Sequence, residues 1–304
     1  MPPKSTAEEL DEALTVLRAS SRHRVLEALE FQEFRGSGPI KQPSMALVID
    51  VETTGVLHGQ DRVIQLAAQP FHYCRSSGFI TKVLPPLCFF DDPKIPIPEL
   101  IQKLTGITDA MVVGQSIDER AIISVAQASD LIIAHNAAFD RPFVESRLAM
   151  FPRRQWACSM TDVPWLEECG TSAKALEHLL FRVCGKFYDA HAADADCLAV
   201  VELLATQFPS GGTALSALLA ASRRQEVRIS AIGAPFDKKD VLKARRYSWF
   251  NGSATREKAW RIELPADRQE SELAWLDANV YAEARRRVLC EPLSPMERFS
   301  GATS

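Results

Sequence analysis

The order of apolar and polar positions predicts a group of strands followed by alternating strands and helices. The runs with strand character are 45–51, 62–71, 78–90 and 130–136. The runs with helical spacing are 116–128, 137–150, 172–183 and 191–208. Three consecutive strands that give way to alternation imply an α/β fold, with a mixed sheet and helices on its faces.

The two ends of the chain predict smaller units. In the first, 1–44, apolar residues at helical spacing predict two amphipathic helices docked on the main domain. In the last, 213–304, the pattern predicts helices at 213–225, within 235–246 and at 270–288. It predicts strands at 226–232, 247–250 and 259–264. Asn251-Gly252 between aromatic flanks predicts a hairpin. With cuts at Pro/Gly/Ser-rich stretches, we expect a helical extension (1–44), a main domain (45–208) and an α+β module (213–304).

Composition fits this division. A chain of 304 residues is longer than one hydrophobic core needs, and its 46% hydrophobic and 24% charged residues are typical of globular proteins. No apolar run reaches the roughly 18–20 residues of a membrane helix, and the polar, acidic start does not resemble a signal peptide. Seven scattered cysteines without a C-x-x-C pair suggest neither disulfides nor a zinc site. We therefore expect a cytoplasmic protein without disulfides and without a membrane partner.

The net charge of −4 alone argues against a nucleic-acid partner, but the charge is unevenly distributed. Counting Lys and Arg against Asp and Glu gives −7 for 45–208 and +7 for 213–262. The basic segment also contains Trp249 and Trp260. Basic residues interleaved with aromatic ones are typical of single-strand binding surfaces, although the two tryptophans can equally pair across the hairpin as a core. We expect Trp260 in the core, and possible nucleic-acid contacts at Lys238, Lys239, Lys243, Arg245 and Arg246.

Carboxylates at three places in the main domain carry the candidate chemistry. Asp50 and Glu52 are separated by one residue on a strand, so both side chains point to the same face. Two adjacent carboxylates repel each other unless a cation lies between them, so the pair indicates a cation site. The alternative interpretation is an exposed strand end without a function. Asp140 begins a helix after an apolar strand, and Asp196 begins another, five residues after His191.

These residues resemble the motifs of a known family. Asp50 and Glu52 in D-x-E-T-T-G, Asp140 in A-H-N-x-x-F-D, and His191 with Asp196 in H-x-x-x-x-D resemble the three motifs of DEDDh (DnaQ-like) 3′–5′ exonucleases, such as the polymerase III epsilon subunit and RNase T. The related DEDDy class has a tyrosine four residues before the last aspartate, where this chain has Ala192. The resemblance covers about 45–208 and implies a ribonuclease H-like mixed sheet of five strands.

The resemblance also implies roles. Asp50, Glu52, Asp140 and Asp196 would hold two Mg²⁺ or Mn²⁺ ions, and His191 would take a proton from the attacking water. Asp50 would bridge the ions, Glu52 and Asp196 would complete one site, and Asp140 would act in the other largely through water. Asp194 has no assigned role. The residues expected to contact the substrate are Thr53, Thr54, Gly55, Asn136 and Phe139, of which Phe139 can instead belong to the core and Asn136 can instead satisfy backbone groups.

Three functions follow as hypotheses. The first is a metal-dependent 3′–5′ exonuclease that releases nucleoside 5′-monophosphates from DNA, with single-stranded DNA favoured and a polymerase or repair partner possible. The second keeps the chemistry and changes the substrate to RNA or short oligoribonucleotides. The third is a catalytically silent, polymerase-associated nucleic-acid-binding subunit, against which the intact carboxylates and His191 argue.

Overall fold

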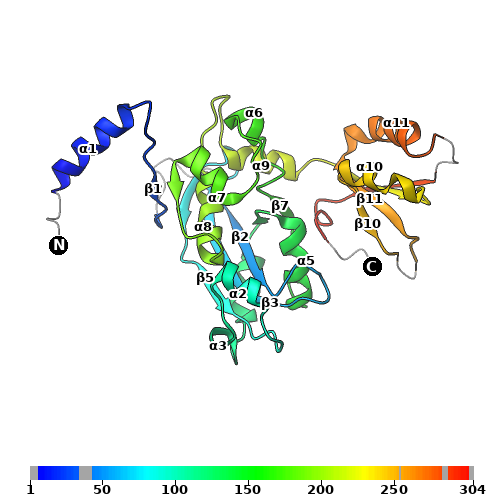
Figure 1. Cartoon of the computed structure of the whole chain (residues 1–304), viewed down its shortest axis with the longest axis horizontal. Coiled ribbons are helices and arrows are strands. Elements are labelled where there is room, and N and C mark those ends of the chain that lie inside the picture. Colours follow the sequence, from blue (N-terminus) through cyan, green and yellow to red (C-terminus); the bar gives the residue numbers. More distant parts are fainter. Residues whose placement is uncertain (1–5, 34–42, 253–254, 283–286, 301–304) are drawn as a thin grey trace.

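The computed structural model describes residues 6–33, 43–252, 255–282 and 287–300. Its central body is a mixed sheet with helices on both faces (Figure 1). The strands are β2 (Pro43–Thr53), β3 (Val63–Cys74), β4 (Ile80–Val83), β5 (Leu87–Phe90), β6 (Leu131–Ala134) and β7 (Trp156–Cys158). The helices are α2 (Glu99–Thr105), α3 (Asp109–Val112), α4 (Glu119–Ala128), α5 (Ala137–Arg147), α6 (Trp165–Cys169), α7 (Leu176–Leu179), a π-helical turn (Leu180–Cys184), α8 (Ala193–Leu204) and α9 (Ala214–Ser222).

The sheet confirms the predicted α/β class. Its strand order is β4-β3-β2-β6-β7, with β5 also paired to β3. Strands β2, β3, β4 and β5 form an antiparallel meander. Strand β6 pairs in parallel with β2, and β7 pairs in parallel with β6. The described sheet has six strands rather than the expected five, because the strand expected over 78–90 is interrupted at Pro85-Pro86, where proline cannot donate a ladder hydrogen bond.

β2 is buried on both faces, as its run of apolar residues indicates. Ala46 and Val48 pack in one core with α8 and α9, and Leu47 and Ile49 pack in the opposite core with α4 and α5. Because side chains alternate along a strand, Asp50 and Glu52 continue the face that packs against α8.

The N-terminal segment differs from its prediction. Within residues 6–33, the structure has one helix, α1 (Ala7–Ala19), and the expected second helix is instead extended, with β1 (Glu27–Ala28) pairing in parallel with β8 (Lys186–Phe187). The Arg24 guanidinium donates to the carbonyls of Phe181 and Arg182 and lies over the Phe181 ring, which fixes this extended path. α1 lies apart from the central body, and its Val16 is 70% exposed, so the prediction that it docks on the main domain is wrong (Figure 1).

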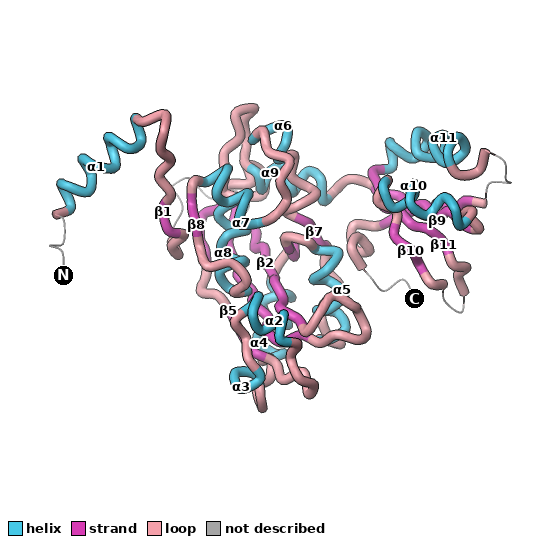
Figure 2. The backbone as a smooth tube through the Cα atoms, viewed as in Figure 1, coloured by secondary structure: helices cyan, strands magenta, loops and turns pink. Residues whose placement is uncertain are grey.

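The C-terminal module has β-α-β-β-α-β order and an antiparallel sheet, β10-β11-β9-β12. Figure 2 shows its helices α10 and α11 beside these strands. Its elements are β9 (Glu226–Ile232), a 3-10 turn (Phe236–Lys238), α10 (Lys239–Ala244), β10 (Ser248–Phe250), β11 (Ala259–Pro265), a second 3-10 turn (Ala266–Arg268), α11 (Gln269–Asn279) and β12 (Val288–Leu293). The helix expected over 270–288 ends at Asn279, and residues 283–286 of that prediction lie outside the described residues. Alternate residues of β12, Val288 and Cys290, pack against the module's core, so this segment follows a strand period.

The segment between the two expected domains packs against the main sheet. α9 shares a core with α8, and the module's sheet begins at Glu226. Among the described residues, none of the helices combines the length and the apolar character that a membrane crossing requires.

Gly78 offers a stability test, because it joins the meander to α9. Its φ is +69°, and an added Cβ would lie 2.5 Å from the Ser216 backbone nitrogen. We expect Gly78→Ala to lower the free energy of unfolding by roughly 2–4 kcal/mol, because it combines backbone strain with a clash against backbone. The matched control is Gly114→Ala, which has φ +73° and open space around it, and should cost only about 1–2 kcal/mol. Equal losses in denaturant titrations of the two variants would contradict the packing argument.

Candidate active site

Three carboxylates meet where β2 faces the start of α8. Asp50 and Glu52 lie near the end of β2, opposite Ala67 and Gln65 of β3, and Asp196 lies in the first turn of α8. One oxygen from each carboxylate lies within 4.8 Å of the others. Gln65 connects β3 to the start of α8, because its Oε1 accepts the backbone N–H of Ala193 at 3.3 Å.

Asp140 reaches the same region from the other side. It lies in the first turn of α5 and is 3% exposed. Its Oδ1 accepts the backbone N–H of Val51, the residue between Asp50 and Glu52, at 3.3 Å. The structure therefore brings the four carboxylates predicted from the motifs together, from one strand and two helices.

Burial and mutual repulsion keep protons on this cluster. Burial first, and then the charges of Asp196 and Asp140, raise the pKa of Glu52 to about 8. The pKa of Asp140 is raised to about 7, chiefly by burial. Burial and the neighbouring carboxylates also raise the pKa of Asp50 well above its usual range. Hard oxygen donors that repel one another in this way fit a divalent cation such as Mg²⁺ or Mn²⁺, which would replace the protons.

Asp196 is held by two donors from the loop before α8. The Tyr188 hydroxyl donates to Asp196 Oδ1 at 2.5 Å, and the backbone N–H of His191 donates to Oδ2 at 3.2 Å. His191 has φ +67°, in the left-handed region, and its side chain is exposed beside the cluster. The sequence motifs do not include Tyr188, because it lies outside the H-x-x-x-x-D spacing. Asp194 is exposed and lies outside the carboxylate cluster.

The turn after Glu52 is stabilised by its own hydrogen bonds. The Thr53 hydroxyl donates to the Gly55 carbonyl at 2.6 Å, and the Thr54 hydroxyl donates to Asp61 Oδ1 at 3.1 Å. A Cβ on Gly55 would lie 2.6 Å from Asp61 Oδ2, so Asp61 requires glycine there. Sequence analysis did not identify Asp61, since a lone aspartate in a loop carries no motif.

The residues around Asp140 divide into structural and exposed groups. His135 Nε2 faces the Lys174 carbonyl at 2.6 Å and therefore carries the proton, and Nδ1 lies 2.8 Å from the Ser159 hydroxyl. Phe139 packs partly against the core, 5.0 Å from the Phe143 ring. Asn136 is exposed at the N-cap of α5, and its side chain makes no capping bond there.

The basic residues predicted for nucleic-acid contact lie in α10 and directly beside its two ends. Lys238 and Lys239 are half-buried and Lys243 and Arg246 are exposed, whereas Arg245 forms a bidentate ion pair with Glu272. Trp249 and Trp260 are cross-strand neighbours, with ring centroids 5.4 Å apart. Trp260 is buried in the module's core, as predicted, and Trp249 is half exposed.

Comparison with known proteins agrees with this geometry. Residues 47–204 match the family model RNase_T, described as exonuclease. The "DNA polymerase III PolC-type" of Clostridium perfringens is 33% identical over 104 residues, 34% of this chain and 7% of the polymerase. That of Staphylococcus aureus is 32% identical over 102 residues, 33% of this chain and 7% of the polymerase. The chain thus spans a small fraction of the length of these relatives.

Two exonucleases are among the solved structures that resemble this chain. "Exonuclease X in complex with 5′ overhanging duplex DNA" is 23% identical, with a TM-score of 0.39, over 52% of this chain and 89% of that one. The zinc-bound "E.coli ExoI-ssDNA complex" is 15% identical, with a TM-score of 0.45, over 73% of this chain and 63% of that one. The family model spans more than half of the chain and contains all four carboxylates and His191. The chain therefore belongs to the DnaQ-like DEDDh family of 3′–5′ exonucleases.

Proposed function

We propose that this protein removes nucleotides one at a time from the 3′ end of DNA, with single-stranded DNA favoured, and releases nucleoside 5′-monophosphates. The observation that carries the proposal is the convergence of Asp50, Glu52 and Asp196 within 4.8 Å beside Asp140, with an exposed histidine next to them. DNA is favoured over RNA because the curated relatives are DNA polymerases. A polymerase or repair partner is part of the same proposal.

Asp50, Glu52, Asp140 and Asp196 would hold two divalent cations. Bound there, the cations would stabilise the charge that develops on the attacking and leaving oxygens. The chain's own contribution begins with His191, whose exposed imidazole accepts a proton from the attacking water as the water oxygen bonds to phosphorus. The bond from phosphorus to the 3′ oxygen of the preceding nucleotide breaks, and that oxygen leaves and takes up a proton from solvent. Thr53, Thr54, Gly55, Asn136 and Phe139 would position the terminal nucleotide.

The direct test compares matched DNA and RNA oligonucleotides, each with Mg²⁺ and with chelator. We expect Mg²⁺-dependent degradation, faster on single-stranded DNA than on the same sequence as RNA, and none with chelator. Faster degradation of RNA would transfer the proposal to an exoribonuclease, and undiminished activity in chelator would refute the metal site.

Tyr188→Phe tests how Asp196 is positioned. This change keeps the ring and removes the hydroxyl that donates to Asp196. We expect kcat to fall roughly tenfold and the half-saturating Mg²⁺ concentration to rise, as is typical when a partner of a metal-ligating group is removed. Phe187→Ala is the control, because Phe187 is exposed on the neighbouring edge strand. A Tyr188→Phe enzyme with unchanged Mg²⁺ dependence would contradict this role.

The basic helix can be tested by charge reversal. We expect Lys239→Glu with Lys243→Glu to weaken binding of single-stranded DNA and to make binding less dependent on salt. The log–log slope should fall by roughly 0.7 for each phosphate that the helix no longer neutralises. Fluorescence anisotropy at several salt concentrations measures both the affinity and the slope. Lys103→Glu with Arg120→Glu makes the same charge change on α2 and α4. Equal slopes in the two variants would show that α10 does not contact the phosphates.

A further inference from the structure

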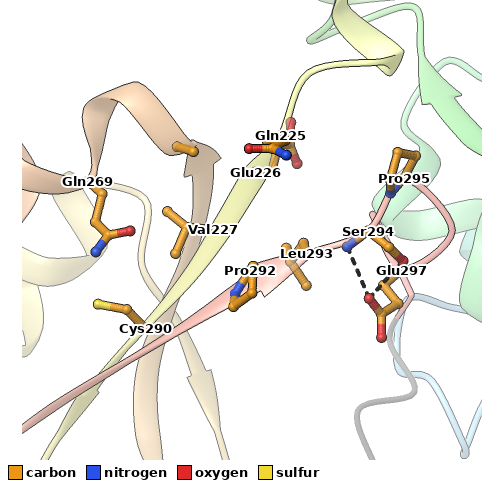
Figure 3. Close-up of a pocket in the computed structure, with 11 residues that line it drawn as sticks. Gln225, Glu226, Val227, Gln269, Cys290, Pro292, Leu293, Ser294, Pro295 and Glu297 are labelled. Carbon is orange, nitrogen blue, oxygen red and sulfur yellow. Dashed lines mark hydrogen bonds between the residues drawn. The ribbon is translucent and has the colours of Figure 1, made fainter.

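The chain returns from the C-terminal module to the exonuclease domain through residues 294–300, here called the C-terminal strap. It begins where β12 ends, beside a hollow of about 560 Å³ between β9, β12 and the start of α11 (Figure 3). At its start, the Ser294 backbone N–H and hydroxyl both donate to Glu297 Oε2, at 3.0 and 2.8 Å. The strap then enters the exonuclease domain, where its last described residues, 298–300, are buried or half-buried.

Arg298 fixes the strap by buried ion pairs. It is 3% exposed, and its guanidinium donates to both oxygens of Asp162, at 2.6 and 3.1 Å. Glu226, the first residue of β9, lies 2.9 Å from the same guanidinium. Asp162 is itself anchored, because its Oδ2 accepts the backbone N–H of Cys158 at the end of β7. One arginine thus connects the exonuclease domain to the first strand of the module.

The strap also holds the helix that carries Asp140. Arg141, the next residue of α5, is 4% exposed and donates to the carbonyls of Arg298 and Met296, at 2.6 and 2.7 Å. Its Nε donates to Glu145 of the same helix, which also accepts the Ser300 hydroxyl at 3.4 Å. Phe299 packs against the core that contains Phe143 and Val144 of α5.

From these contacts we propose that the C-terminal strap is part of the active-site scaffold, with Arg298 as a positioning residue that keeps α5, and therefore Asp140, in place. A buried guanidinium needs hydrogen-bond acceptors, and the strap supplies two of those that Arg141 uses. Without the strap, Arg141 loses these two acceptors, and α5 loses the contacts that Phe299 and Ser300 make with it. The effect on catalysis rests on the proposed function, whereas the effect on α5 does not.

The test compares Arg298→Ala, Arg298→Lys and the control Arg268→Ala in the full-length chain. Arg268 is an exposed arginine in the turn before α11. The first readout is hydrogen exchange of peptides covering 137–147. The second is kcat and KM for nucleotide release with Mg²⁺. Arg298→Lys keeps the charge but cannot bind Asp162 with a bidentate fork, so it serves as the conservative variant if Arg298→Ala does not fold.

We expect faster exchange at 137–147 and a kcat lowered at least tenfold in Arg298→Ala, with KM changed less than about threefold, since small misplacements of reacting groups act on the chemical step. Arg298→Lys should lie between this variant and the wild type, and Arg268→Ala should match the wild type. Wild-type exchange at 137–147 in both Arg298 variants would overturn the proposal. If the wild type released no nucleotide, the proposed function would fail, while the exchange data would still decide what the strap does.

Discussion

Asp50→Asn is expected to lower nucleotide release by more than about 10³-fold while making the metal-free protein more stable. Asp50 is one of the carboxylates proposed to hold the cations, and a neutral amide cannot replace it. In the absence of metal, however, the same carboxylate adds repulsion to a buried cluster. Its removal should raise the free energy of unfolding by about 1–3 kcal/mol in chelator at pH 8. Each pKa unit by which a group differs between the folded and unfolded states is worth about 1.4 kcal/mol.

The sign of the pH dependence follows from the raised pKa values. Glu52 and Asp140 have pKa values of about 8 and 7 in the folded protein, so the folded state holds protons that the unfolded state has released. The metal-free wild type should therefore lose stability as pH rises from about 5 to 8. Added Mg²⁺ should restore the stability lost at high pH, and Asp50→Asn should weaken both the pH dependence and the gain from Mg²⁺.

Thermal unfolding in Mg²⁺ and in chelator measures the two effects. Asp194→Asn, on the same helix as Asp196 but outside the cluster, is the control, and a destabilised, inactive Asp50→Asn would contradict the account.

His191→Asn is expected to lower kcat by roughly 10²–10⁴-fold while leaving the metal-dependent gain in thermal stability unchanged. Asparagine tolerates the left-handed backbone at φ +67°, so the backbone N–H can still donate to Asp196. The change therefore removes the proton acceptor and keeps the loop.

Single-turnover nucleotide release, measured against pH, checks this prediction. His178→Asn is the matched control, since His178 is exposed on α7 and is not assigned to the site. A His191→Asn enzyme within about threefold of the wild type would show that another group takes the proton.

The main domain could be predicted from sequence because its elements have strong local patterns. The apolar run in β2 marks a strand buried on both faces, and Asp50 and Glu52 stand out where that run ends. The second N-terminal helix was predicted wrongly because distant partners decide that segment, and the helix expected over 270–288 ends at Asn279, before strand β12. Arg24 is fixed by carbonyls more than 150 positions away along the chain, and β12 forms only because β9 offers an edge.

In the candidate site, too, residues in local motifs could be predicted and residues that act through tertiary contacts could not. The four carboxylates and His191 lie in compact motifs, so their assembly could be expected. Tyr188, Asp61 and Arg298 could not be found in this way, because each acts through a contact that the fold creates and none has a motif of its own. The predicted role of Arg245 as a phosphate contact stays a proposal, and its pairing with Glu272 depends on a residue 27 positions later.

The central claim is tested most directly by the identity of the first product and the end from which it is released. A single-stranded DNA oligonucleotide labelled at the 3′-terminal nucleotide is incubated with enzyme and Mg²⁺, beside the same strand labelled at its 5′ end. The account predicts that the 3′ label appears at once as a nucleoside 5′-monophosphate, while the 5′-labelled strand shortens one nucleotide at a time. Release of the 5′ label first, of internal fragments, or of 3′-monophosphates would contradict it.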